Sequence, residues 1–206
     1  MNLASVLLLA FAALVGLVMH ELAHAVAADR MGDPTPRVAG RLTLNPLAHL
    51  DFLGTLMLLV TGRFGWAKPV PVNFANVRHY RLGLIWISLA GPLANLIIAL
   101  LASLPLRAYF SGGLLAGEAT GQAALLLLRV LMDVNLGLAL FNLLPIPPLD
   151  GAKVVQGLLP PRYSLRFEQL EGYGPMILVL FLVIPGAVSA VLGPAFSFLY
   201  RLILGV

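Results

Sequence analysis

Two histidines four residues apart, His20 and His24, lie near the end of a long apolar run, with Glu21 beside the first. Residues four apart share one face of a helix, so both imidazoles can point at one cation. This spacing is typical of a zinc site with an acid–base carboxylate. The alternative is a polar cluster whose three side chains satisfy one another inside a helix bundle. Each ionisable group in an apolar span costs about 2.5–3.5 kcal/mol on insertion scales, which favours a functional site.

The composition indicates a membrane protein. Of 206 residues, 60% are hydrophobic and 11% are charged, and the mean hydropathy is +0.94, whereas soluble domains have about 25% charged residues. No polar stretch reaches the roughly 50 residues of a separate soluble domain, so one domain over residues 1–206 is expected. The chain has no cysteine, so a zinc ion would be held by His, Asp or Glu. The scattered basic residues predict membrane topology and no nucleic-acid partner.

Four apolar runs are long enough to cross a bilayer: 3–28, 82–108, 121–145 and 175–204. Pro185 and Pro194 are expected to kink or break the last run, and residues 152–172 form a polar link before it. The run 52–61 is half the usual length of a span, which favours a re-entrant segment over a full span. Residues 41–44 and 68–73 are predicted to be short extended segments. The predicted fold is therefore an all-α polytopic bundle of about four to five transmembrane segments, with a small membrane-associated β-sheet and re-entrant region.

The basic residues predict which ends of these spans are cytoplasmic. Ten of the thirteen Lys and Arg residues fall between the first two clear spans or between the third and the last. Because cytoplasmic loops carry an excess of Lys and Arg, these connections are predicted to be cytoplasmic and the N-terminus outside. The other three basic residues, on the opposite side or within a span, are Arg107, Arg129 and Arg201.

This topology brings a third candidate ligand to the histidines. The end of the first span carries His20 and His24, and the end of the third leads into Asp150-Gly151, at the same predicted face. Two histidines leave a tetrahedral zinc one protein ligand short before water takes the open position, and Asp150 can supply that ligand. The alternative for Asp150-Gly151 is an ordinary turn after a helix.

Other polar residues in the spans have two interpretations. Asn95, early in the second clear span, could donate to an oxyanion or hold a substrate backbone, or it could form an interhelical hydrogen bond. Asn135 and Asn142 have the same alternatives, with packing favoured. We expect His49 to be structural and His79 to be interfacial.

Three motifs together resemble the site-2 protease family of intramembrane zinc metalloproteases: His20–His24, Gly91–Asn95 and Asn142–Gly151. Residues 40–46 and 69–73 are similar to the family's membrane-associated sheet region. The resemblance covers about residues 15–155. Nothing resembles an inserted PDZ domain or a C-terminal CBS pair, so a minimal catalytic core is expected.

The resemblance implies one Zn²⁺ per chain, held by His20, His24 and Asp150, with Glu21 as the catalytic base. Asn95 matches a family residue that assists substrate or transition-state binding. The implied activity is hydrolysis of peptide bonds in or near transmembrane helices of membrane-anchored substrates, at the cytoplasmic side. The expected partners are these substrate helices and the lipid bilayer. We further hypothesise that an unwound substrate adds to a strand edge near 41–44 or 69–73.

Two other classes of protein are weighed against a protease. A zinc-binding transporter or sensor would have little need of Glu21 between its ligands, and no internal repeat of the transporter kind is found. A structural bundle with a self-satisfied polar cluster would contain no stoichiometric zinc.

Overall fold

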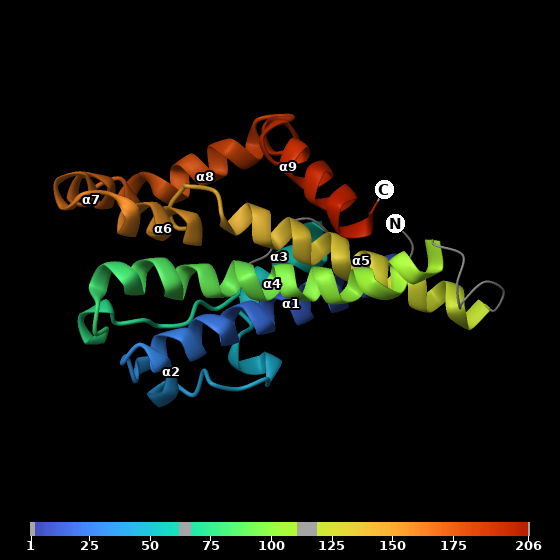
Figure 1. Cartoon of the computed structure of the whole chain (residues 1–206), viewed down its shortest axis with the longest axis horizontal. Helices are drawn as coiled ribbons and strands as arrows, with labels where there is room; N and C mark the ends of the chain where they lie inside the picture. The colour runs from blue at the N-terminus through green and yellow to red at the C-terminus, as the bar shows by residue number, and fades with distance from the viewer. Residues whose placement is uncertain (1–2, 62–66, 111–118, 206) are drawn as a thin grey trace.

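The computed structural model describes residues 3–61, 67–110 and 119–205, and three long helices form its centre (Figure 1). They are α1 (Leu3–Arg30), α4 (Tyr80–Phe110) and α5 (Ala119–Asn142), and each packs against the other two. α9 (Ala187–Leu204) packs on α4 and α5. Among the described residues, four helices are long and apolar enough to cross a membrane: Leu3–Arg30, Tyr80–Phe110, Gly121–Asn142 and Ala187–Leu204. The predicted helical membrane bundle is thus confirmed at the level of its helices.

Small residues lie inside this bundle and large apolar residues lie outside it. Ala12, Ala25 and Ala99 are fully buried between helices, while Phe11 and Leu101 are among many large apolar side chains that are exposed. Small residues let helix backbones approach closely, which is how helices associate in lipid, where apolar burial gives no advantage. The larger core side chains, which include Met132, Leu136 and Leu106, gather between α4, α5 and α9.

The direction of the helices brings parts of five helices toward one end of the bundle. α1 ends there and α4 begins there, and α5 ends there before α6 (Asp150–Leu158) and α7 (Pro161–Glu168) (Figure 1, left). The segment 152–172, predicted as a polar link, is therefore mostly helical.

The last apolar run forms two helices where one span was predicted. α8 (Gly174–Val183) ends before Pro185, and α9 begins after Gly186, whose φ of +81° is left-handed. Pro185 cannot continue the helix, and Gly186 adopts the turn at no steric cost. Pro194 lies inside α9 without ending it.

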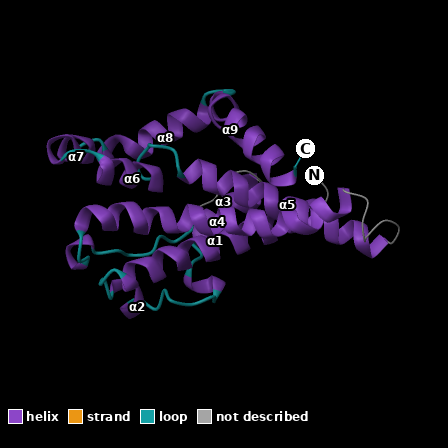
Figure 2. Cartoon of the chain, in the orientation of Figure 1, coloured by secondary structure: helices purple, strands orange, loops and turns teal. Residues whose placement is uncertain are grey.

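The predicted β-sheet is wrong for the part of the chain that the structure describes. Residues 31–79 contain α2 (Thr35–Val38), α3 (Phe52–Thr61) and two short 3-10 turns, Pro46–Ala48 and Phe74–Asn76. Figure 2 shows no strand among the described residues, and their only β-pairing is an isolated antiparallel bridge between Leu50 and Ala67. The backbone donors of segment 68–73 explain the difference, because Pro69 and Pro71 have no N–H. The backbone N–H groups of Val70 and Asn73 donate to the side chains of Glu21 and Asp33, respectively, instead of to a neighbouring strand.

The bridge between Leu50 and Ala67 also holds together the residues on either side of the segment 52–61. Leu50 pairs with Ala67, and the Lys68 N–H donates to the His49 carbonyl at 2.8 Å. The chain therefore leaves and returns at one place on either side of α3. With ten residues, α3 has half the length of about 20 residues that a membrane span needs.

Candidate metal centre

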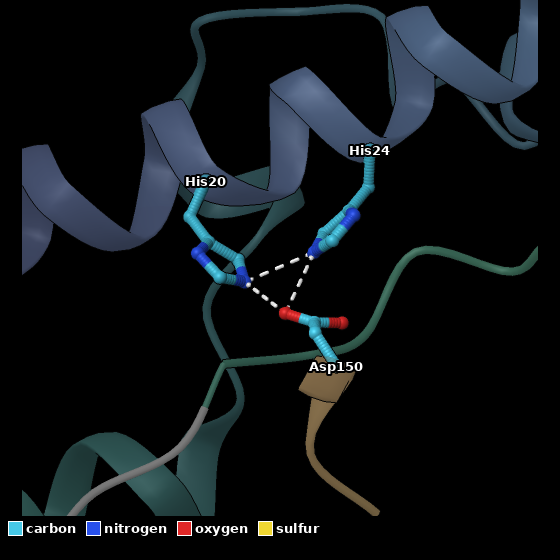
Figure 3. A group of neighbouring side chains, drawn as sticks. All are labelled: His20, His24 and Asp150. Atoms are coloured by element: carbon cyan, nitrogen blue, oxygen red, sulfur yellow. Dashed lines mark hydrogen bonds and ion pairs between the residues drawn. The ribbon is translucent and has the colours of Figure 1, made fainter. Parts of the chain in front are cut away.

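His20, His24 and Asp150 lie together, although Asp150 is 126 positions after His24 in the chain (Figure 3). The two histidine Nε2 atoms are 3.0 Å apart. Asp150 Oδ2 lies 3.1 Å from Nε2 of His20 and 3.2 Å from Nε2 of His24. The histidines project from consecutive turns of α1, and Asp150 is the first residue of α6. The structure thus places the three predicted ligands in one nearly equilateral triangle of donor atoms.

Two glycines make room for this triangle. A Cβ at Gly91 of α4 would collide with the imidazole rings of both His20 and His24. A Cβ at Gly151 would collide with the backbone of Leu143, which allows α6 to fold back against the end of α5. Both glycines are therefore required by close approach rather than by backbone conformation.

The hydrogen bond of His24 determines which of its ring nitrogens carries the proton. His24 Nδ1 lies 2.7 Å from the backbone carbonyl oxygen of Ile87. A carbonyl only accepts, so Nδ1–H is the donor. In the neutral ring, Nε2 then carries a lone pair directed at the triangle.

Hydrogen bonds between the side-chain amides of Asn135 and Asn95 determine which ring nitrogen of His20 carries the proton. Asn135 Nδ2 donates to the Leu131 carbonyl at 2.8 Å, so Asn135 Oδ1 is left to accept from Asn95 Nδ2, also at 2.8 Å. Asn95 Nδ2 also donates to the Gly16 carbonyl at 3.0 Å. Asn95 Oδ1 is thus the atom that faces His20 Nδ1, at 2.7 Å, and it must accept from it. The Nε2 atom of His20 therefore also presents a lone pair.

These residues fit a zinc ion. Two imidazole lone pairs and a carboxylate oxygen converge without a hydrogen between them, and Asp150 Oδ2 is buried without a hydrogen-bond partner among the described residues. Three acceptors at this distance repel one another unless a cation lies between them. Zinc bonds to N and O of about 2.0–2.1 Å in a tetrahedron place ligand atoms about 3.3–3.4 Å apart. The observed separations of 3.0–3.2 Å are close to that value.

A cavity of about 160 Å³ adjoins the triangle and is bordered by Glu21. The cavity is also lined by the segment 67–73, which with Phe74–Val77 we call the strap. Glu21 Oε2 accepts a hydrogen bond of 3.0 Å from the Val70 N–H of the strap. The carboxylate is thus held at the edge of the space that an attacking water would occupy.

Asp33 anchors the strap to the end of α1. Its carboxylate accepts from the Asn73 N–H at 2.7 Å and from Asn76 Nδ2 at 3.0 Å, and also from Thr35. Burial by itself would raise the pKa of the Asp33 carboxyl, but the hydrogen bonds from Thr35, Asn76 and Asn73 lower it overall. Asp33 is therefore ionised, and this buried carboxylate was not identified from the sequence. A short acidic loop residue carries no sequence signal of partners that lie 40 residues away.

Asn95 lies in a different place from that expected for a substrate-binding residue. Its side chain is fully buried behind His20 and is not part of the cavity wall. Both hydrogens of its amide are already donated, to Gly16 and Asn135, so none is left for an oxyanion. Asn135 is fully buried in the same network, as the packing interpretation expects.

The remaining polar residues are separate from the triangle. His49 is buried and donates from Nε2 to the Thr43 carbonyl at 2.8 Å, which agrees with a structural role. His79 is exposed. Asn142 borders the cavity while donating to the Leu138 carbonyl of its own helix. Lys153 also borders the cavity and was missed from the sequence. Its position three residues after Asp150 on a helix was the available signal, because residues i and i+3 share a face.

The chain is similar in sequence to known proteins. Residues 105–185 match the model of Peptidase family M50. Over 174 residues the chain is 42% identical to "Putative zinc metalloprotease YwhC" of Bacillus subtilis (strain 168), an alignment that covers 84% of this chain and 78% of that protein. The chain belongs to peptidase family M50, the site-2 protease family.

Two further relatives of this M50 chain are named "Putative zinc metalloprotease Rip2". The one from Mycolicibacterium smegmatis (strain ATCC 700084 / mc(2)155) is 32% identical over 179 residues, covering 84% of this chain and 65% of that protein. The one from Mycobacterium tuberculosis (strain ATCC 25618 / H37Rv) is 33% identical over 180 residues, covering 82% of this chain and 64% of that protein. The M50 chain thus spans just under two thirds of the Rip2 proteins. No solved structure matches it.

Proposed function

We propose that this protein is a zinc-dependent intramembrane endopeptidase that hydrolyses peptide bonds in or near transmembrane helices of membrane-anchored substrates. The observation that carries the proposal is the triangle of two imidazole lone pairs and one carboxylate oxygen beside Glu21. The helices that carry it are long and apolar enough to cross a membrane. The names of the M50 relatives support a zinc-dependent protease.

In this proposal His20, His24 and Asp150 hold the zinc ion. When bound, zinc supplies Lewis-acid activation of water and of the scissile carbonyl. Asn95 and the Ile87 carbonyl hold the two imidazoles in the ligand tautomer and orientation, which raises ligand basicity. Asn95 is therefore a positioning residue that acts through His20.

Glu21 has the proton-transfer role. Its Oε2 atom is held by the Val70 N–H, and we assign Oε1 to the water. Glu21 takes the proton of the attacking water and delivers it to the leaving amine, as a general base and then a general acid. The oxygen of the water must lie within about 2.6–3.2 Å of such a carboxylate oxygen, and the cavity that Glu21 and the ligand triangle share allows this distance.

The size of the cavity supports cleavage of an unwound segment. A helix with its side chains is about 10–12 Å across, which a cavity of about 160 Å³ cannot admit. The substrate helix therefore has to open locally, which also frees the carbonyl that its own hydrogen bond would protect. We propose that this occurs at the cytoplasmic side, because the predicted cytoplasmic connections carry most of the basic residues.

Glu21→Gln tests the proposal. Membranes that contain the parent protein should yield new peptide termini inside or next to membrane spans, and membranes with Glu21→Gln should yield none. Both proteins, once purified, should contain about one zinc per chain, because Gln keeps the size of the side chain outside the ligand triangle. Identical sets of termini from the two membranes would exclude the protease, and zinc flux retained by both in vesicles would favour a transporter.

A further inference from the structure

A second cavity adjoins the one beside the metal centre. It has a volume of about 240 Å³ and lies between the start of α6 and the start of α8. The two cavities share a wall made of Pro148 and Lys153. Apart from Lys153 and the exposed Glu171, the second cavity is lined by apolar side chains: Pro147, Pro148, Leu149, Ala152 and Pro175.

Lys153 divides the two spaces without placing its charge in the second one. Its Nζ lies over the ring of Phe74 in the strap, 5.5 Å from the ring centroid, within the range of a cation–π interaction. Phe74 borders the first cavity only. A lysine whose ammonium is held on one side presents its methylene stem to the other. The wall on the side of the second cavity is thus apolar.

The second cavity is built into packed elements. Leu149 and Ala152 are buried. α8 begins so close to Pro147 that a Cβ at Gly174 would collide with its backbone and ring. An apolar cavity of about 150 Å³ can hold a benzene molecule, so 240 Å³ is enough for the side chain of Leu, Met or Phe.

We propose that the second cavity is a substrate subsite that takes one large apolar side chain next to the cleaved bond. This inference rests on the proposed protease function. In an extended chain the residues are about 3.3 Å apart and alternate between faces. A carbonyl at the metal centre therefore brings a neighbouring side chain to the shared wall of Pro148 and Lys153. Apolar membrane spans offer such side chains at most positions.

The experiment varies the substrate and the cavity together. The probe is a single-span model protein that the purified parent enzyme cleaves in nanodiscs, made with Ala, Leu or Phe at each of the two positions on either side of the cleaved bond. At one of these positions the parent should cleave the Leu or Phe form with a kcat/KM about 10-fold or more above that of the Ala form, since pockets discriminate apolar groups by about 10–200-fold.

Ala152→Phe fills the cavity from α6 and should remove this preference. The kcat/KM of the Leu and Phe forms should fall about 10-fold, to the level of the Ala form. Val155→Leu is the matched control, because it enlarges an α6 side chain that borders neither cavity, and it should keep the parent preference. If Ala152→Phe contains less than one zinc per chain, its loss of activity does not report on the cavity. Pro175→Phe, which fills the cavity from α8, then tests the substrate preference in its place.

The outcomes separate this inference from the function on which it rests. If the parent cleaves no probe that Glu21→Gln leaves intact, the protease proposal fails. If the parent cleaves but shows no preference, or if both filled variants retain the preference, the cavity is not a substrate subsite.

Discussion

The ligand triangle depends on which atoms of three buried side chains carry hydrogen. The Leu131 and Gly16 carbonyls fix the orientation of Asn135 and Asn95, and Asn95 then fixes the tautomer of His20. These contacts join α1, α4 and α5, so the protonation of one ligand is determined by the packing of three helices. Partners that hold the second nitrogen of a histidine typically change metal affinity by 10–100-fold when they are removed.

Asn95→Ala should therefore weaken zinc binding by about 10–100-fold, because His20 Nδ1 loses its acceptor. Competition with a chelator of known affinity measures this loss, without any assay of cleavage. Ser103→Ala is the control, because Ser103 is a buried polar residue of the same helix whose hydroxyl donates to the Leu100 carbonyl of that helix. Equal zinc affinities for the two variants would contradict the positioning role.

Gly91→Ala tests the close approach of α4 to the histidines. The added methyl group would collide with both imidazoles, so the purified variant should contain far less than one zinc per chain while retaining its helical circular dichroism. Gly137→Ala is its matched control, since a Cβ at Gly137 of α5 meets nothing within 4 Å. That variant should keep its zinc and gain slightly in stability, because Gly inside a helix costs about 0.5–1 kcal/mol relative to Ala. A full complement of zinc in Gly91→Ala would refute the predicted collision.

At the scale of elements, the strap is held by side chains where a sheet was expected. The Asp33 carboxylate accepts a hydrogen bond from the Asn73 N–H, and the Glu21 carboxylate accepts one from the Val70 N–H. The expected short strands were inferred from the local alternation of apolar residues and prolines, and such a local pattern carries no information about the partners of that backbone. For this reason the helices and the ligand spacing on α1 follow from local sequence, whereas the strap contacts do not. The approach of Asp150 follows from charge topology, which depends on the whole chain.

Asp33→Asn should loosen the strap, because the new amide NH₂ has to face either the Asn73 N–H or the Asn76 Nδ2 group. Hydrogen–deuterium exchange at the amides of Val70 and Asn73 should become faster at pH 7. The folded pKa of Asp33 lies below its ordinary value of 3.8. The difference from the parent is therefore fully present above pH 3.8, and it should vanish as the pH falls through the lower folded value.

The control for Asp33 is the nearby surface ion pair of Asp29 and Arg37, in which Asp29 Oδ2 lies 2.6 Å from Arg37 Nη2. Surface ion pairs contribute little to stability, so Asp29→Asn should leave the exchange of the strap unchanged. Equal exchange rates in Asp33→Asn and the parent would mean that the strap is held by other contacts.

At the scale of the whole molecule, the site lies toward one end of the bundle, where α1 and α5 end and α4 begins (Figure 1). The opposite end holds the packed core of Leu106, Met132 and the end of α9. The chemistry is thus separated from the part of the bundle with the largest buried apolar side chains. Removing zinc should consequently leave the helices folded.

The orientation of the whole molecule can be measured directly, because the chain has no cysteine. Tyr163→Cys of α7 lies at the end of the bundle near the site, and Phe110→Cys of α4 lies at the opposite end; both side chains are exposed. If the basic connections are cytoplasmic, a membrane-impermeant maleimide added to whole cells should label Phe110→Cys only. Tyr163→Cys should react once the membrane is opened. The reverse pattern would place the metal centre on the outer side, where substrates would have to be cut from the other face of the bilayer.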